Sequence, residues 1–160
     1  MSENNEEVTL LLQLESLIGP WEGNILRRYC HLSNASALLW DYFKQINWVG
    51  FYLVEEGKER LILGPFQGKV ACTDIQFSRG VCGKAARSAQ SQLVEDVHLF
   101  PGHIACDVAS RSELVVPILD ARGDVVALID VDSPLVGRFT KSDQTLLEQV
   151  SSLLAKMLWT

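Results

Sequence analysis

The sequence is short of basic residues and of long apolar runs. Its 160 residues carry 14 lysines and arginines against 20 aspartates and glutamates, for a formal net charge of -6. The basic residues form no stripe, which argues against a nucleic-acid-binding face. No apolar run approaches the roughly 18 residues that a membrane-spanning helix needs. Residues 1–7 also lack the basic and apolar segments of a signal peptide. We therefore expect a cytoplasmic protein that binds neither nucleic acid nor membrane.

The four cysteines include no Cys-x-x-Cys pair, the spacing typical of structural zinc sites. A cytoplasmic protein is also not expected to carry structural disulfides, because that compartment keeps thiols reduced. The cysteines are then catalytic thiols, buried apolar residues, or ligands of a mixed metal site that uses His98 or His103. The spacing itself predicts no metal or cofactor.

The hydrophobic pattern predicts one α+β layered domain, and the length fits a single core. We expect residues 1–22 to form a tail and a short helix, and residues 23–160 to form the main domain. Helices are predicted at 8–18, 24–45, 80–89 and 142–158, strands at 46–54, 60–63, 74–77, 92–94, 113–119 and 125–131, and loops at 64–73 and 96–110.

Three of the cysteines lie in or beside predicted loops. Cys82 opens a helix within a glycine-rich turn, where the helix dipole favours the thiolate. Cys106 ends the long loop near His103, and Cys72 lies in another loop. These thiols could meet if the loops close over one face of the sheet. Cys30 differs, because its place inside a helix predicts a small buried apolar residue.

Two pairs of residues in the strands have two interpretations each. Asp130 and Asp132 are two apart, so their side chains point to the same face of a strand. They end an apolar run, where a charge is costly without a partner. They are either solvated residues at a strand end or part of a binding pocket. Trp48 and Tyr52 also share a face, as core aromatics or as the wall of a pocket.

Several motifs in this chain occur together in one known family. They are Asn47-Trp48-Val49-Gly50-Phe51-Tyr52, Gly64-Pro65-Phe66-Gln67-Gly68, Gly80-Val81-Cys82-Gly83, Phe100-Pro101-Gly102-His103-Ile104-Ala105-Cys106-Asp107, Ser110-Arg111-Ser112-Glu113 and Ile129-Asp130-Val131-Asp132-Ser133-Pro134. In this order they resemble the free methionine-(R)-sulfoxide reductases, which are built on a GAF domain. The resemblance covers nearly the whole chain. The three cysteines and the Pro-Gly-His loop are specific to this enzyme branch among GAF domains.

The resemblance implies a fold and a reaction. The fold is a GAF-like domain over residues 23–160, with an antiparallel sheet of about six strands flanked by helices, and often a homodimer. The reaction is the reduction of free L-methionine-(R)-S-oxide to methionine without a cofactor. Thioredoxin is the expected reductant.

The resemblance also implies roles for the thiols. Cys106 attacks the substrate sulfur and becomes a sulfenic acid, which a second thiol condenses to a disulfide. Thiol–disulfide exchange with the reductant then closes the cycle. Cys72 is the first choice for the resolving thiol and Cys82 is a second resolving or relay thiol, but the order of these two stays open.

The substrate-binding roles come from the same resemblance. Glu113 would hydrogen-bond the sulfoxide oxygen and could supply the proton. Asp130 and Asp132 would hold the substrate ammonium. Trp48 and Tyr52 would form an apolar wall for the methyl–sulfur end. Crowded carboxylates raise one another's pKa, so one of them can stay protonated near neutral pH.

Three other functions stay open at this point. A GAF sensor would bind a small ligand without turnover, and a thiol switch would form a disulfide without a sulfoxide substrate. A zinc module would hold a structural metal. The role of His103 is also open, between polarising Cys106 and capping its loop.

Overall fold

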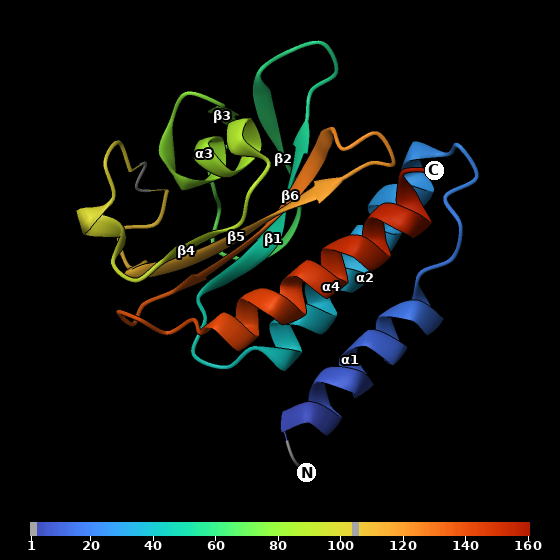
Figure 1. The fold of residues 1–160 in the computed structure, drawn as a ribbon, viewed down its shortest axis with the longest axis horizontal. Coiled ribbons are helices and arrows are strands. Elements are labelled where there is room, and N and C mark those ends of the chain that lie inside the picture. Colours follow the sequence, from blue (N-terminus) through green and yellow to red (C-terminus); the bar gives the residue numbers. More distant parts are fainter. Residues whose placement is uncertain (1–2, 104–105) are drawn as a thin grey trace.

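The computed structural model describes residues 3–103 and 106–160. The elements in this part of the chain are α1 (Glu3–Leu17), α2 (Ile25–Tyr42), β1 (Trp48–Val54), β2 (Arg60–Gly68), β3 (Asp74–Gln76), α3 (Gly80–Ser88), β4 (Gln92–Val94), the 3-10 helix η1 (Val97–Leu99), β5 (Ser112–Leu119), β6 (Val125–Ser133) and α4 (Lys141–Leu158). The predicted α+β class is confirmed, since antiparallel strands and helices form separate layers (Figure 1).

The six strands form one antiparallel sheet in the order β3-β2-β1-β6-β5-β4. The hairpins β1–β2 and β5–β6 meet where β1 pairs with β6, so residues near position 50 lie beside residues near position 130. Asp120 closes the second hairpin, because its Oδ1 accepts hydrogen bonds from the backbone N–H groups of Arg122 and Asp124. The predicted antiparallel sheet of about six strands is confirmed.

The two faces of the sheet carry different cores. α1, α2 and α4 cover one face, and α3 covers the other (Figure 1). Because alternate residues of a strand point to opposite faces, Val49 and Phe51 pack under the three helices, whereas Trp48 and Tyr52 face α3. The strands are apolar on both faces, but the α3 face also receives the buried acidic residues.

The helices on the first face are fixed by packing and by capping. α1 buries Leu10 and Leu14 in the core shared with α2 and α4. α4 begins with a capping box, in which Thr140 and Asp143 each accept the other's backbone N–H. Within the described ranges, no helix is both long enough and apolar enough to cross a bilayer.

The prediction that a loop follows residue 63 is wrong, because β2 continues to Gly68. The register of β1 against β2 shifts between Gly50 and Tyr52, and Pro65 falls at this irregularity. Proline cannot donate to a strand ladder, so it is tolerated at such bulges. The bulge therefore explains how a Gly- and Pro-containing segment stays in the sheet.

The prediction that Cys30 is buried is also wrong, since its side chain is exposed and its thiol is free. α2 turns Leu32, Ala35 and Leu39 toward the core. Residues two apart on a helix lie on different sides of it, so Cys30 points away from the face that holds Leu32.

Candidate active site

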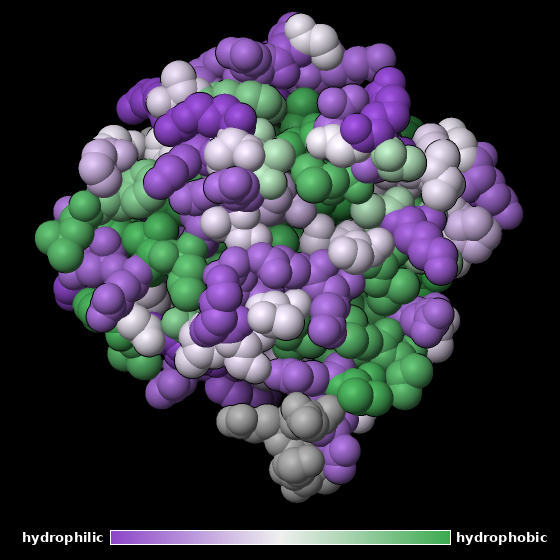
Figure 2. Space-filling model, viewed as in Figure 1, coloured by the Kyte–Doolittle hydropathy of each residue, from purple (hydrophilic) through white to green (hydrophobic). Residues whose placement is uncertain are grey.

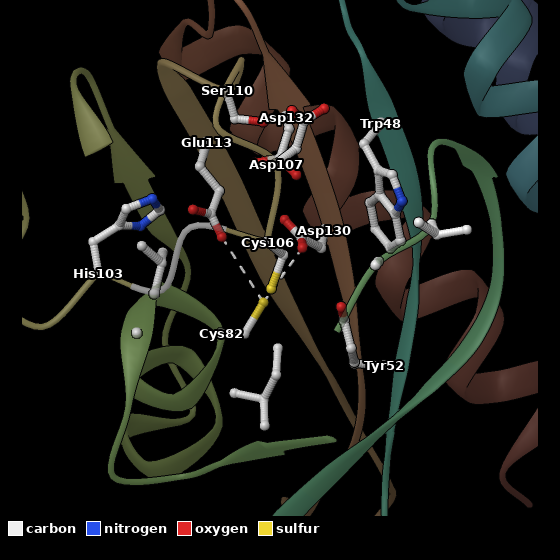
Figure 3. A pocket seen from close by; sticks show the side chains of 15 residues that line it. Trp48, Tyr52, Cys82, His103, Cys106, Asp107, Ser110, Glu113, Asp130 and Asp132 are labelled. Atoms are coloured by element: carbon white, nitrogen blue, oxygen red, sulfur yellow. Dashed lines mark hydrogen bonds between the residues drawn. The ribbon is translucent and has the colours of Figure 1, made fainter. Parts of the chain in front are cut away.

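A pocket opens on the α3 face of the sheet, with about 550 Å³ of empty space when the solvent at its open mouth is included. The side chains come from β1, β3, β5, β6, the start of α3 and two loops (Figure 3). Of the site residues predicted from sequence, those that line it are Trp48, Tyr52, Cys82, Cys106, Glu113, Asp130 and Asp132. Cys72 is bonded to one of them, so the fold brings all eight together.

A disulfide joins Cys72 and Cys106 at the pocket, with their Cα atoms 5.6 Å apart. The Tyr52 hydroxyl donates a 3.1 Å hydrogen bond to the Cys72 carbonyl and so holds this loop against β1. Cys106 is exposed and Cys72 is partly buried. Ile104 and Ala105, which belong to the family motif, lie outside the described residues.

Cys82 is a free thiol buried at the base of the pocket. Its Sγ lies 3.4 Å from Asp130 Oδ2 and 3.9 Å from Glu113 Oε1, and it donates to both (Figure 3). Burial raises the pKa of Cys82, and these acidic neighbours raise it further. The expectation of a Cys82 thiolate at the helix N-terminus is therefore wrong, because desolvation outweighs the helix dipole.

Glu113, Asp130 and Asp132 form a carboxylate cluster on β5 and β6. Glu113 lies directly opposite Asp132 in the strand register, and Asp130 is on the same face. Glu113 is 6% exposed and Asp130 is 5% exposed, so neither is a solvated residue at a strand end.

Burial and mutual repulsion favour the protonated forms of this cluster. Burial raises the pKa of Glu113 well above its usual range, and repulsion from Asp130 and Asp132 adds to the effect. Burial also raises the pKa of Asp130, to about 7, even though contacts with Cys82 and Glu113 partly oppose the shift. The pKa of Asp132 rises through burial and through repulsion from Asp130 and Asp107. The pocket therefore offers both acid hydrogen-bond donors and carboxylate acceptors.

Among the described residues that line the pocket, none is lysine or arginine. His103 is the basic side chain there, and burial lowers its pKa, with a smaller contribution from His98. Its backbone N–H donates to Phe100 O at 3.2 Å and closes a turn of the loop. The acidic pocket therefore favours a ligand that brings its own positive charge.

One wall of the pocket is a stack of aromatic rings. The ring centroids of Trp48 lie 5.9 Å from those of Tyr52 and 5.3 Å from those of Phe66. Gly50 lies between Trp48 and Tyr52 on this face, and a Cβ there would stand 2.3 Å from Phe66 Cβ. Trp48 and Tyr52 are thus both core aromatics and pocket wall. No role was predicted for Gly50, although an isolated glycine in a strand often indicates such a close approach.

A second feature without a predicted role fixes the loop that carries Cys106. Asn47 Nδ2 donates to Asp107 Oδ2 at 3.2 Å and to Ser110 Oγ at 3.1 Å. Asp107 also accepts the Ala109 N–H at 2.9 Å. These bonds tie the end of the loop to the start of β1. All three polar residues lie in the family motifs, but their spacing of about 60 residues gives no signal of contact.

Comparisons with known proteins agree with this geometry. The GAF domain family model matches residues 35–158. A free methionine-R-sulfoxide reductase of Escherichia coli is 50% identical over 81% of this chain and 76% of its own length. The Saccharomyces cerevisiae protein of the same name is 45% identical over 96% of this chain and 87% of its own.

A solved structure extends the comparison to three dimensions. The free methionine-R-sulfoxide reductase of Neisseria meningitidis, in complex with its substrate, superposes with a TM-score of 0.85 at 38% identity. The match covers 94% of this chain and 87% of that one. On this evidence the chain belongs to the free methionine-R-sulfoxide reductases, a family of oxidoreductases built on the GAF fold.

Proposed function

We propose that this protein reduces free L-methionine-(R)-S-oxide to L-methionine. The observation that carries the proposal is the Cys72–Cys106 disulfide at a pocket that combines buried carboxylates with an aromatic wall. A disulfide of this kind is the product expected after thiol-based reduction of a sulfoxide. The family membership supports the same reaction.

The cycle balances with two thiols. The Cys106 thiol attacks the sulfoxide sulfur, the S–O oxygen ends on Cys106 as a sulfenic acid, and methionine leaves. The Cys72 thiol then displaces water from the sulfenic acid and forms the disulfide. The net change is the uptake of two electrons and two protons by the sulfoxide, with release of one water. The 5.6 Å separation of the Cα atoms supports this pairing, since it is the usual disulfide spacing.

The carboxylate cluster can bind both the sulfoxide oxygen and the ammonium group of the substrate. Burial and nearby acids raise the pKa of Glu113 and favour its protonated form, so it can donate to the sulfoxide oxygen as the S–O bond breaks. Asp130 and Asp132 face the same pocket and would hold the substrate ammonium. A methionine sulfoxide within a peptide lacks that charge and would leave these carboxylates unpaired, which strongly disfavours it.

The apolar end of the substrate fits the aromatic wall. We propose that Trp48 and Tyr52 contact the methyl–sulfur group. Cys82 would serve as an auxiliary thiol for relay or second resolution, since it lines the same pocket but is not in the disulfide. Its raised pKa makes it a slow nucleophile, which supports placing it after Cys72 in the cycle.

We propose thioredoxin as the reductant. A protein dithiol must reach a sulfur of the disulfide, and Cys106 is exposed. Val70, which lines the pocket, and Val108, two residues beyond Cys106, are 88% and 84% exposed and provide apolar contact area beside it. The exposed free thiol of Cys30 suits a reducing compartment, so we place the reaction in the cytoplasm.

A homodimer is a further proposal. Val8 and Leu12 on α1, and Leu26 on α2, expose more than half of their side chains. In Figure 2, hydrophobic side chains gather on the side of the molecule along which α1 runs. A second copy covering these outer faces would remove them from water. Sedimentation velocity tests this, and a protein that stays monomeric at high concentration contradicts it.

The deciding experiment measures methionine formed from each epimer of free methionine sulfoxide, with thioredoxin, its reductase and NADPH. We expect turnover of the R epimer only, and none with Cys106→Ser. No methionine from the R epimer refutes the function and leaves a ligand sensor or a thiol switch. A switch would form the disulfide with peroxide, and a sensor would bind ligand without turnover. Equal rates for peptide-bound sulfoxide would refute the proposed selectivity.

A further inference from the structure

The base of the pocket presents three metal-binding donors from three different elements. Cys82 comes from α3, Glu113 from β5 and Asp130 from β6, and one donor atom of each lies within 4.8 Å of the others. All three side chains are buried. We propose that Cys82, Glu113 and Asp130 bind a zinc ion, which occupies the pocket and reversibly excludes other ligands.

The spacing of the donors suits tetrahedral zinc. Zinc binds cysteine sulfur at about 2.3 Å and carboxylate oxygen at about 2.0–2.2 Å, which places tetrahedral sulfur and oxygen donors about 3.6 Å apart. The Sγ of Cys82 lies 3.4 Å from Asp130 Oδ2 and 3.9 Å from Glu113 Oε1. An ion can therefore enter between these atoms with only small side-chain adjustments.

A second observation points to a ligand at the same place. Asp130 is 5% exposed, yet its Oδ1 has no hydrogen-bond partner in the described part of the chain. A buried polar atom in this condition costs free energy unless a partner arrives. Asp130 lines the pocket, and Figure 3 shows its carboxylate near Cys82. A cation at this position would satisfy the carboxylate.

The pocket leaves room for the rest of the coordination sphere. Three protein ligands with a fourth position open to water or a small molecule form the arrangement of open, catalytic-type zinc sites. The donors are anchored on the sheet and on α3, so the ligands are positioned before the ion arrives. Thiolate with carboxylates favours zinc over magnesium or calcium, which prefer oxygen alone.

Glu113 and Asp130 are the groups assigned to the substrate, so zinc and substrate would compete. Only this competition rests on the proposed function, because zinc binding itself is measured without turnover. Zinc binding is best measured on the protein with the Cys72–Cys106 disulfide formed, because these two cysteines cannot then act as thiolate ligands.

Zinc binding to the oxidised protein is measured by competition with a chromophoric chelator, and cobalt replaces zinc for absorption spectroscopy. We expect one ion per chain and a sulfur-to-cobalt charge-transfer band. Cys82→Ser should lose the band and bind zinc more than about 100-fold more weakly, since loss of even an outer partner of a ligand costs 10–100-fold. Cys30→Ser is the matched control and should bind zinc as the wild type does, because Cys30 is exposed on another face.

Circular dichroism shows whether Cys82→Ser folds. If it does not, Asp130→Asn provides a second test, because this variant keeps the Cys82 thiol. It should also weaken zinc binding. Free methionine sulfoxide should lower the apparent zinc affinity as its concentration rises. Wild-type affinity in a folded Cys82→Ser or Asp130→Asn, or loss of the site in Cys30→Ser, would overturn the site. Zinc binding to a protein without reductase activity would refute the function alone.

Discussion

Replacing Asp130 by asparagine should stabilise the fold at alkaline pH and not at acid pH. The carboxyl has an ordinary pKa of 3.8, and burial raises it to about 7. The folded state therefore binds a proton more tightly than the unfolded chain does, and the free energy of unfolding falls as pH rises between about 4 and 7. Below about pH 4 the carboxyl is protonated in both the folded and the unfolded state, so it does not lower the free energy of unfolding.

The size of the effect follows from the pKa shift. Each unit corresponds to about 1.4 kcal/mol, so a shift of about three units makes ionised Asp130 cost up to about 4 kcal/mol above pH 7. Asparagine has nearly the same shape and no charge. Removing Asp130 also removes a repulsive neighbour of Glu113, so the pKa of Glu113 is raised less and the stability gains further at high pH, whereas the lost contact with Cys82 offsets part of the gain. We expect Asp130→Asn to be about 2–4 kcal/mol more stable than the wild type at pH 8.

Urea unfolding of the disulfide form at pH 4, 6 and 8 measures the difference. Asp124→Asn is the control, because Asp124 is an exposed hairpin residue in a surface ion pair with Arg122. The control should change stability by less than about 0.5 kcal/mol at each pH. An Asp130→Asn gain that is the same at pH 4 and pH 8, or a loss at pH 8, would refute this reasoning. The same variant should turn over substrate poorly, because it removes a proposed ligand of the ammonium.

Three further changes test other parts of the structure. With thioredoxin, its reductase and NADPH present, Cys72→Ser should form at most one methionine per chain in a rapid-quench burst and then turn over far more slowly than the wild type, and an unchanged steady rate would contradict its role as resolving thiol. Gly50→Ala should cost about 1–3 kcal/mol in urea unfolding and raise KM, because its Cβ would meet Phe66; wild-type values for both would refute the close packing. Thr140→Ala should lower the free energy of unfolding by about 1 kcal/mol through the lost contact with Asp143, and a changed kcat/KM would show that the cap affects more than stability.

Sequence reasoning could predict the elements and the residue types of the site, since both follow from local patterns. The alternation in β5 and β6 identified the strands, and the motifs named the cysteines and carboxylates. It could not predict contacts that depend on register. Asn47 meets Asp107 only because β1 lies beside the end of a distant loop.

Solvent exposure is the second property that could not be predicted from the sequence. Cys82 begins a helix, which favours a thiolate, but tertiary packing buries it among acids and reverses the preference. Cys30 lies within a helix, which suggested burial, yet it is on the outer side of α2. Pro65 suggested a loop, whereas a bulge keeps it within the sheet. In each case the tertiary surroundings, and not the local pattern, decided the outcome.

The disulfide between Cys72 and Cys106 spans 34 residues and links two loops that no strand pair connects. Closing a loop of that length in the unfolded chain is worth about 4 kcal/mol in the chain-entropy model. If the bond opens and closes once per catalytic cycle, the enzyme alternates between a more stable resting form and a less stable form that is ready for substrate. Proteases would then cut the protein faster when reductant is plentiful. When reductant is scarce, the protein would stay in the more stable disulfide form.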